Sequence, residues 1–332
     1  MVRGSFKLTN AYLQATCSAI GNKEAKGKMK AYADIIYKDN YFGTKSFEEA
    51  ERKMQADVIN LLKDKKHLID LDIDYVLGGD LISQEIITNY TMKNYNIPFL
   101  GLYGACSTFA MATIIGAIIV DKGLGKSVIS LASSHREAAE RTFRYPVEYG
   151  GAKEDSATIT VTGCGAFLIG KTPSNIKITE VTVGRVIDIG YKNSFDLGGA
   201  MAPSAIETLT NHFKAFKSSP KDYDLIVTGD LSQIGRSIVF EALNNQYNGV
   251  KNYDDCGLIA YDYFKEQVFS GGSGAGCVAS VAAGYIYQKL LDKELKKVLI
   301  CATGALLNNT TTLQKTSIPA ISHVFVLERV DY

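Results

Sequence analysis

The chain has 332 residues, 46% of them hydrophobic, and a formal net charge of +1 at pH 7. This length and apolar content support a large core, built as one broad domain or as two fused halves. The near-neutral charge gives no reason to expect nucleic acid or an acidic membrane surface as a bulk partner.

Targeting, membrane and metal signals are absent from the sequence pattern. Lys7 is followed by no apolar run, so no signal peptide is expected. The longest nearly uncharged stretch, residues 105–120, is shorter than the roughly 20 residues of a membrane span and favours a buried central helix. Six cysteines without a Cys-x-x-Cys pair predict reduced thiols in a cytosolic compartment. Four histidines without a His-Glu-x-x-His pattern predict no metal site, and no cofactor is expected.

In chain order, strands of four to eight apolar residues alternate with helical patterns. Residues 48–63 and 202–216 have apolar residues three to four apart, which predicts amphipathic outer helices. The small-residue helices after Cys106 and Gly276 lack a polar face, so we expect them between two sheets. The glycine-rich segment 271–276 lacks the order of a nucleotide-binding fingerprint.

The sequence repeats itself in four corresponding elements. The run DYVLGGDL at 74–81 reappears as DLIVTGDL at 224–231, and the turn and helix after 104 have a counterpart after 272. Each helix is followed by a buried-type strand, at 126–134 and 297–304, and each half closes on another strand-like run, at 158–170 and 321–330. We therefore predict an α/β fold of five layers, α-β-α-β-α, with mostly parallel mixed sheets. Its pseudo-twofold halves are residues 1–172 and 173–332.

Cys106 stands between a short apolar strand and a long helix, in the segment GLYGACSTFAM at 101–111. A helix N-terminus offers backbone N–H groups and the positive end of the dipole, which favour a thiolate and can hold an anion. The alternative is a small buried residue, which we favour for Cys164, Cys256, Cys277 and Cys301. For Cys106, the turn favours a functional role.

The duplicated unit with a cysteine on its first strand-to-helix turn resembles the thiolase superfamily, and within it the stage V sporulation protein AD family of spore-forming bacteria. The supporting segments are YVLGGDL at 75–81, LYGACST at 102–108, ASSH at 132–135, RYPVEYG at 144–150, TVTGCGA at 160–166, GGSG at 271–274, ATGALL at 302–307 and SIPAISH at 317–323.

The resemblance implies a fold like that of condensing enzymes and a role in moving dipicolinic acid, or its calcium chelate, into the developing spore. It implies as partners other proteins of the same operon, which form a channel at the inner forespore membrane. With no spanning segment of its own, the chain would lie peripherally at that membrane. By analogy with the superfamily, we expect a homodimer that pairs through a sheet edge beside the cysteine helix.

The residues that a condensing enzyme needs beside its thiol are incomplete. Superfamily members supply a histidine from the loop after the second-half strand and an asparagine from the turn before the second buried helix. Here the loop reads TGDLSQ at 228–233, and Ser273 stands where asparagine is expected. His323 is interpreted as a satisfied structural histidine, and His135 has even odds of lining the same cavity.

We therefore expect ligand binding without turnover. The predicted ligand-binding residues share the two turns and the strand ends around them: Cys106, Asp80, Ser107, Ser133, His135, Gly272 and Ser273.

Some of these roles stay open at the level of sequence. Asp80 could instead cap a helix at 83–93, and for its counterpart Asp230 capping is favoured. Arg136, Arg141 and Arg144, with Tyr145 and Tyr149, offer cations and an aromatic wall, although a solvated helix face or a subunit contact is favoured. The rival functions are an active acyltransferase or condensing enzyme with Cys106 as nucleophile, and a purely structural docking subunit.

Overall fold

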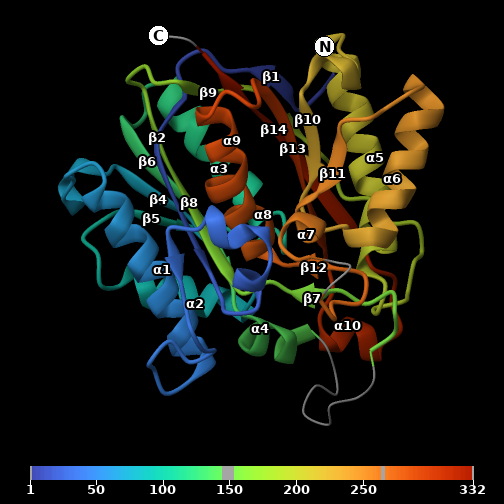
Figure 1. The fold of residues 1–332 in the computed structure, drawn as a ribbon, viewed down its shortest axis with the longest axis horizontal. Coiled ribbons are helices and arrows are strands. Elements are labelled where there is room, and N and C mark those ends of the chain that lie inside the picture. Colours follow the sequence, from blue (N-terminus) through green and yellow to red (C-terminus); the bar gives the residue numbers. More distant parts are fainter. Residues whose placement is uncertain (1, 144–152, 263–265, 331–332) are drawn as a thin grey trace.

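The computed structural model describes residues 2–143, 153–262 and 266–330. Five layers succeed one another across the molecule, with helices outside, a sheet on each side, and helices in the centre (Figure 1). This confirms the α/β prediction. In the part described, no helix is both long enough and apolar enough to cross a membrane.

The two halves have the same strand order. In the first half the order is β5 (Phe99–Gly101), β4 (Tyr75–Gly79), β6 (Ser127–Ser134), β8 (Gly163–Gly170) and β2 (Tyr12–Ile20). In the second half it is β11 (Tyr253–Asp255), β10 (Leu225–Thr228), β13 (Lys297–Ala305), β14 (Ala320–Arg329) and β9 (Ile176–Val183). In each half the outer three strands pair in parallel and the inner two antiparallel.

The two sheets are joined into one, which the sequence pattern did not predict. Tyr12 of β2 pairs with Lys177 of β9, so a continuous path of strands runs from β11 to β5. Short strands extend this core: β1 (Ser5–Lys7) pairs with β9, β3 (Ile35–Ile36) pairs with β2, and β7 (Ile159–Thr160) pairs with β12 (Gly272–Ser273).

Outer helices cover the two sheets. On one side lie α1 (Phe47–Asp64) and α2 (Ile86–Met92), and on the other α5 (Leu197–Phe216) and α6 (Ser232–Tyr247) (Figure 1). The Ser46 hydroxyl caps α1 by accepting from the Glu49 N–H at 3.2 Å. Met54, Val58 and Leu62 of α1 are fully buried, as its apolar spacing predicts.

The central layer consists of α3 (Thr108–Asp121), α8 (Ala275–Val281), a π-helical turn (Ala282–Ile286) and α9 (Tyr287–Leu291). These helices lie between the sheets, as their lack of a polar face predicts (Figure 1). The second half's α8 packs against β8, β6 and β2 of the first half. The Ser18 hydroxyl of β2 donates to the Ser280 carbonyl of α8 at 2.9 Å.

Glycines allow this close packing. A Cβ at Gly165 of β8 would lie 2.0 Å from the carbonyl oxygen of Ala279, and one at Gly276 of α8 would lie 2.1 Å from that of Gly163. Both neighbours are backbone atoms, which no rotamer change can move. Among the described residues, three further short α-helices are α4 (Arg136–Phe143), α7 (Cys256–Ile259) and α10 (Asn309–Leu313).

Candidate functional site

Cys106 lies on a tight turn between β5 and α3. Ala105, just before it, has φ +50°, in the left-handed region that a residue with a side chain adopts at a cost. The Ser107 N–H and hydroxyl both donate to the carbonyl oxygen of Gly104, at 3.0 and 2.7 Å. The Thr108 hydroxyl donates to the Ala105 carbonyl at 2.7 Å. These bonds fix the turn, and Cys106 remains partly exposed at its outer side.

A cavity of about 440 Å³ opens beside Cys106, a size typical of small-molecule sites. Its wall combines apolar side chains with hydroxyls and amides, and no charged residue contributes to the part described. The lining residues are Leu81, Ser83, Gln84, Tyr103, Ala105, Cys106, Thr142, Leu197, Met201, Ser273, Gly274, Ala305, Leu306, Leu307, Asn308 and Thr311.

Two of the seven predicted ligand-binding residues, Cys106 and Ser273, meet at this cavity. The Ser273 hydroxyl also bonds that of Thr158 at 2.8 Å. Gly272 and Ser107 are not among the described lining residues: the Gly272 carbonyl accepts from the Ser232 hydroxyl at 2.6 Å, and Ser107 is fully buried.

Asp80 and Ser133 belong to a buried polar network outside the lining. The Asp80 carboxylate accepts from the N–H groups of Ile82 and Thr88, both at 2.8 Å, which are contacts of the capping kind. Ser133 donates to Glu51 Oε1 at 2.7 Å. Burial, with the negative charge of Asp80, raises the pKa of Glu51 to about 8. Binding roles for Asp80 and Ser133 stay predictions.

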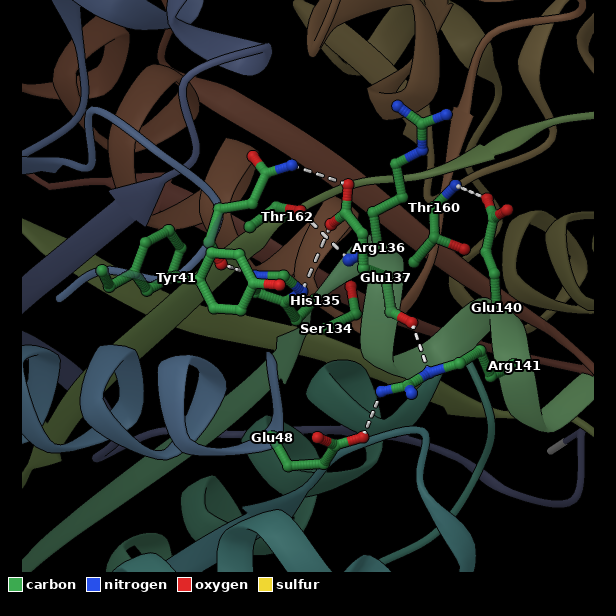
Figure 2. A network of polar contacts seen from close by, with 12 residues as sticks. Tyr41, Glu48, Ser134, His135, Arg136, Glu137, Glu140, Arg141, Thr160 and Thr162 are labelled. Atoms are coloured by element: carbon green, nitrogen blue, oxygen red, sulfur yellow. Dashed lines mark hydrogen bonds and ion pairs between the residues drawn. The ribbon is translucent and has the colours of Figure 1, made fainter. Parts of the chain in front are cut away.

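His135 is fully buried and is not among the described lining residues of the cavity. Its Nε2 lies 2.8 Å from the Asn40 carbonyl oxygen, and its ring stacks on Phe47 with centroids 5.4 Å apart. Figure 2 shows His135 next to Glu137 at the start of α4, and the Nδ1 to Oε2 distance is 3.4 Å. Burial lowers the pKa of His135 despite that carboxylate. The ring therefore supports the base of α4, and its predicted ligand role is untested.

The arginines of α4 have protein contacts on the helix face. Arg141 pairs with Glu48 at 2.5 Å and donates to the Glu137 carbonyl at 3.0 Å (Figure 2). For Arg136 the structure gives a backbone contact, in which its main-chain N–H donates to the Thr162 hydroxyl at 3.0 Å. The predicted contributions of Arg144, Tyr145 and Tyr149 lie outside the described residues.

His323 pairs with Ala302 in the register of β14 and β13 and lies outside the cavity lining. We expected a satisfied structural histidine, but no described residue bonds its buried Nδ1. Burial lowers the pKa of His323 to about 4. The imidazole is therefore neutral in the folded chain at neutral pH.

This histidine predicts acid sensitivity. A pKa of about 4 in the folded chain and about 6.5 in the unfolded chain means that unfolding takes up a proton between these values. The resulting stabilisation is complete above pH 6.5 and falls by up to about 3 kcal/mol towards pH 4. His323→Leu should therefore reduce the drop in melting temperature between pH 7.5 and pH 5. The exposed His67, replaced in His67→Asn, serves as control and should leave that drop unchanged.

The predicted capping role of Asp230 is wrong. The helix α6 is capped instead by Asp255, which accepts from the N–H groups of Leu231 and Ser232 at 2.9 and 2.8 Å. Asp230 is fully buried and accepts hydrogen bonds from the Thr303 hydroxyl and from the Cys106 thiol. The repeat suggested that Asp230 should act like Asp80, but its neighbours come from β13 and from the other half of the chain.

Several lining residues were missed from the sequence. Tyr103 and Leu307 lie in the segments 102–108 and 302–307 that support the family resemblance, whereas Met201 lies just before the helix predicted at 202–216. A second hollow, of about 500 Å³, is lined by Lys28, Arg236 and other residues. There Arg236 is already paired with Asp254 at 3.3 Å, so its guanidinium is less available to a ligand. The Cys106 cavity is therefore the better candidate for a ligand-binding site.

The fold has close structural relatives among condensing enzymes. The 3-oxoacyl-[acyl-carrier-protein] synthase III of Aquifex aeolicus VF5 matches with a TM-score of 0.57 and 12% identity, over 96% of this chain and 99% of that one. A variant of OleA from Xanthomonas campestris, with cerulenin, matches with a TM-score of 0.58 and 9% identity, over 96% and 97% of the two chains. These likenesses confirm the thiolase-like fold.

Sequence comparison is more specific. The profile of the stage V sporulation protein AD family matches residues 4–328. The stage V sporulation protein AD of Bacillus subtilis (strain 168) is 44% identical over 319 residues, covering 96% of this chain and 94% of that protein. The chain therefore belongs to the stage V sporulation protein AD family, a family of sporulation proteins with a thiolase-like fold.

Proposed function

We propose that this chain binds dipicolinic acid, free or as its calcium chelate, in the cavity beside Cys106 and serves its uptake into the developing spore. The proposal rests on membership of a sporulation family together with a cavity of small-molecule size. Binding is non-covalent, and the ligand leaves unchanged.

The cavity wall supports this proposal with neutral hydrogen-bond donors. Ser273, Gln84 and Asn308 bring a hydroxyl and two amides to the lining. Burial is the main cause that raises the pKa of the Tyr103 phenol to about 12, so this hydroxyl keeps its proton and remains a donor at neutral pH. Such groups can bind the two carboxylates of a flat diacid from different sides. Calcium, if present, travels with the ligand and would neutralise its charge.

The main support for binding without catalysis is that the described lining of the Cys106 cavity contains no imidazole. Acyl transfer needs a base or a donor beside the thiol, within about 3 Å of the reacting group. None of the described lining residues is a histidine, and His135 and His323 both lie elsewhere. The thiol has the position of a nucleophile, while the imidazole that a condensing enzyme uses beside it is missing from the described lining.

Calorimetry with dipicolinate tests the proposal. We expect binding heat for the intact protein, and binding about fivefold weaker or worse for Cys106→Ala, because one polar contact to the ligand is lost. Cys17→Ala, which changes a buried cysteine of β2, should bind like the unchanged protein. Absence of heat at millimolar dipicolinate would refute the proposal.

The rival enzyme function has its own measurement. The protein is incubated with acyl-CoA and followed by intact-mass spectrometry. An acyl adduct that forms on Cys106 and then turns over would demonstrate acyl transfer and would refute the non-catalytic proposal. If the cavity variants leave dipicolinate transport intact in spores, a purely structural docking role is favoured.

We also propose pairing of two copies through the sheet edge at β5 and peripheral docking to channel proteins of the same operon. Support for pairing comes from the edge position of β5, where Leu100 is 47% exposed. An edge strand with exposed apolar side chains is a surface that a second chain can extend.

A further inference from the structure

Asp230 is a buried carboxylate that the structure brings into contact with the cavity cysteine. Its Oδ1 accepts from the Thr303 hydroxyl, and its Oδ2 accepts from the Gly274 N–H at 3.4 Å. The Cys106 thiol also donates to this carboxylate. Thr303 belongs to β13 and Gly274 precedes α8. The second half therefore supplies these partners of Asp230, and Asp230 in turn contacts a thiol of the first half.

The direction of the thiol hydrogen bond matters for reactivity. An ionised carboxylate can only accept, so the proton of the pair stays on sulfur. Asp230 is 1% exposed, and no described cation lines the adjoining cavity. A thiolate formed here would lie against a buried negative charge in surroundings of low dielectric, where like charges repel strongly. This opposes the helix N-terminus, which by itself favours the thiolate.

We propose that Asp230 is a positioning residue that holds Cys106 as a neutral thiol, and so suppresses acyl transfer and alkylation at the cavity. A cationic partner would stabilise a nucleophilic thiolate, whereas this anionic one disfavours it. The inference deepens the proposed non-catalytic function and rests on it.

The pH dependence of Cys106 alkylation tests this role. Iodoacetamide reacts with the thiolate, sulfur displaces iodide, and the thiol proton goes to solvent. The full-length protein is labelled between pH 6 and 10, and the Cys106 peptide is quantified by mass spectrometry. The other five cysteines are buried, so background labelling is low. We expect Asp230→Asn to move the half-maximal rate at least one pH unit lower, which is about tenfold faster labelling at neutral pH.

Matched variants separate this role from a structural one. Asp230→Ser also removes the charge and should accelerate labelling, so it decides the matter if Asp230→Asn does not fold. Asp64→Asn removes an exposed carboxylate at the end of α1 and should leave the profile unmoved. If Asp230 only fastens Gly274 and Thr303, its variants melt at lower temperature but keep the alkylation profile, and the inference fails.

Two different measurements distinguish failure of the proposed function from failure of the proposed role of Asp230. Calorimetry reports dipicolinate binding, whereas the alkylation profile reports the thiol in the absence of ligand. An unmoved profile with intact binding overturns only the role of Asp230. A shifted profile with no dipicolinate binding overturns only the choice of ligand.

Discussion

Gly165→Ala is expected to destabilise the fold by about 3 kcal/mol or more, because the added methyl group overpacks a site whose neighbours are backbone atoms. The added methyl group would lie 2.0 Å from the carbonyl oxygen and 2.2 Å from the carbonyl carbon of Ala279 in α8. Both atoms belong to helix backbone, so relief requires α8 to move away from β8 and to open the central core. Thermal and urea unfolding followed by circular dichroism measure the loss.

The same strand supplies the control for this change. A Cβ at Gly170, the last residue of β8, would meet the side chain of Gln14 at 2.8 Å. A rotamer change of Gln14 can relieve this contact, at the loss of its 2.6 Å hydrogen bond to the Thr172 carbonyl, so Gly170→Ala should cost clearly less than Gly165→Ala. Equal losses for the two variants would show that strand propensity, and not the approach of α8, determines the need for glycine at 165.

Leu307→Trp should weaken dipicolinate binding at least about tenfold, a loss of 1.4 kcal/mol or more. Leu307 follows β13 and lines the Cys106 cavity, so an indole ring at this position would reduce the cavity volume available to the ligand. The residue is only partly buried, and the protein should fold normally. Isothermal calorimetry with dipicolinate measures the change.

Leu313→Trp is the matched control for the cavity variant. Leu313 lies six positions further on, in α10, is 71% exposed and does not line the cavity. It should therefore bind dipicolinate like the unchanged protein. If both tryptophan variants bind equally well, the ligand occupies another part of the molecule. The second hollow, at Lys28 and Arg236, would then be the next place to look.

The sequence predicts the architecture well because repetition and periodicity are local signals. The recurrence of DYVLGGDL as DLIVTGDL places β4 and β10 at equivalent positions of the two halves. Helices without a polar face have to lie between sheets, and α3 and α8 do. The joining of the sheets depends on one pair, Tyr12 and Lys177, which no local pattern marks.

The site is less predictable, because its parts meet only in three dimensions. The turn at Cys106 is readable from a strand followed by a small-residue helix, and Ser273 from the corresponding turn of the second half. The orientation of His135 depends on a contact with Asn40, which is distant in the sequence. For Asp230, the internal repeat is itself misleading, since equivalent positions in the two copies have different neighbours.

The packing of α8 across the boundary between the halves has a consequence for folding. Because α8 of the second copy rests on strands of the first, neither copy retains a complete interior when it stands alone. Either half on its own would therefore expose apolar surface that the other half covers in the whole chain, and we expect neither half to be stable alone.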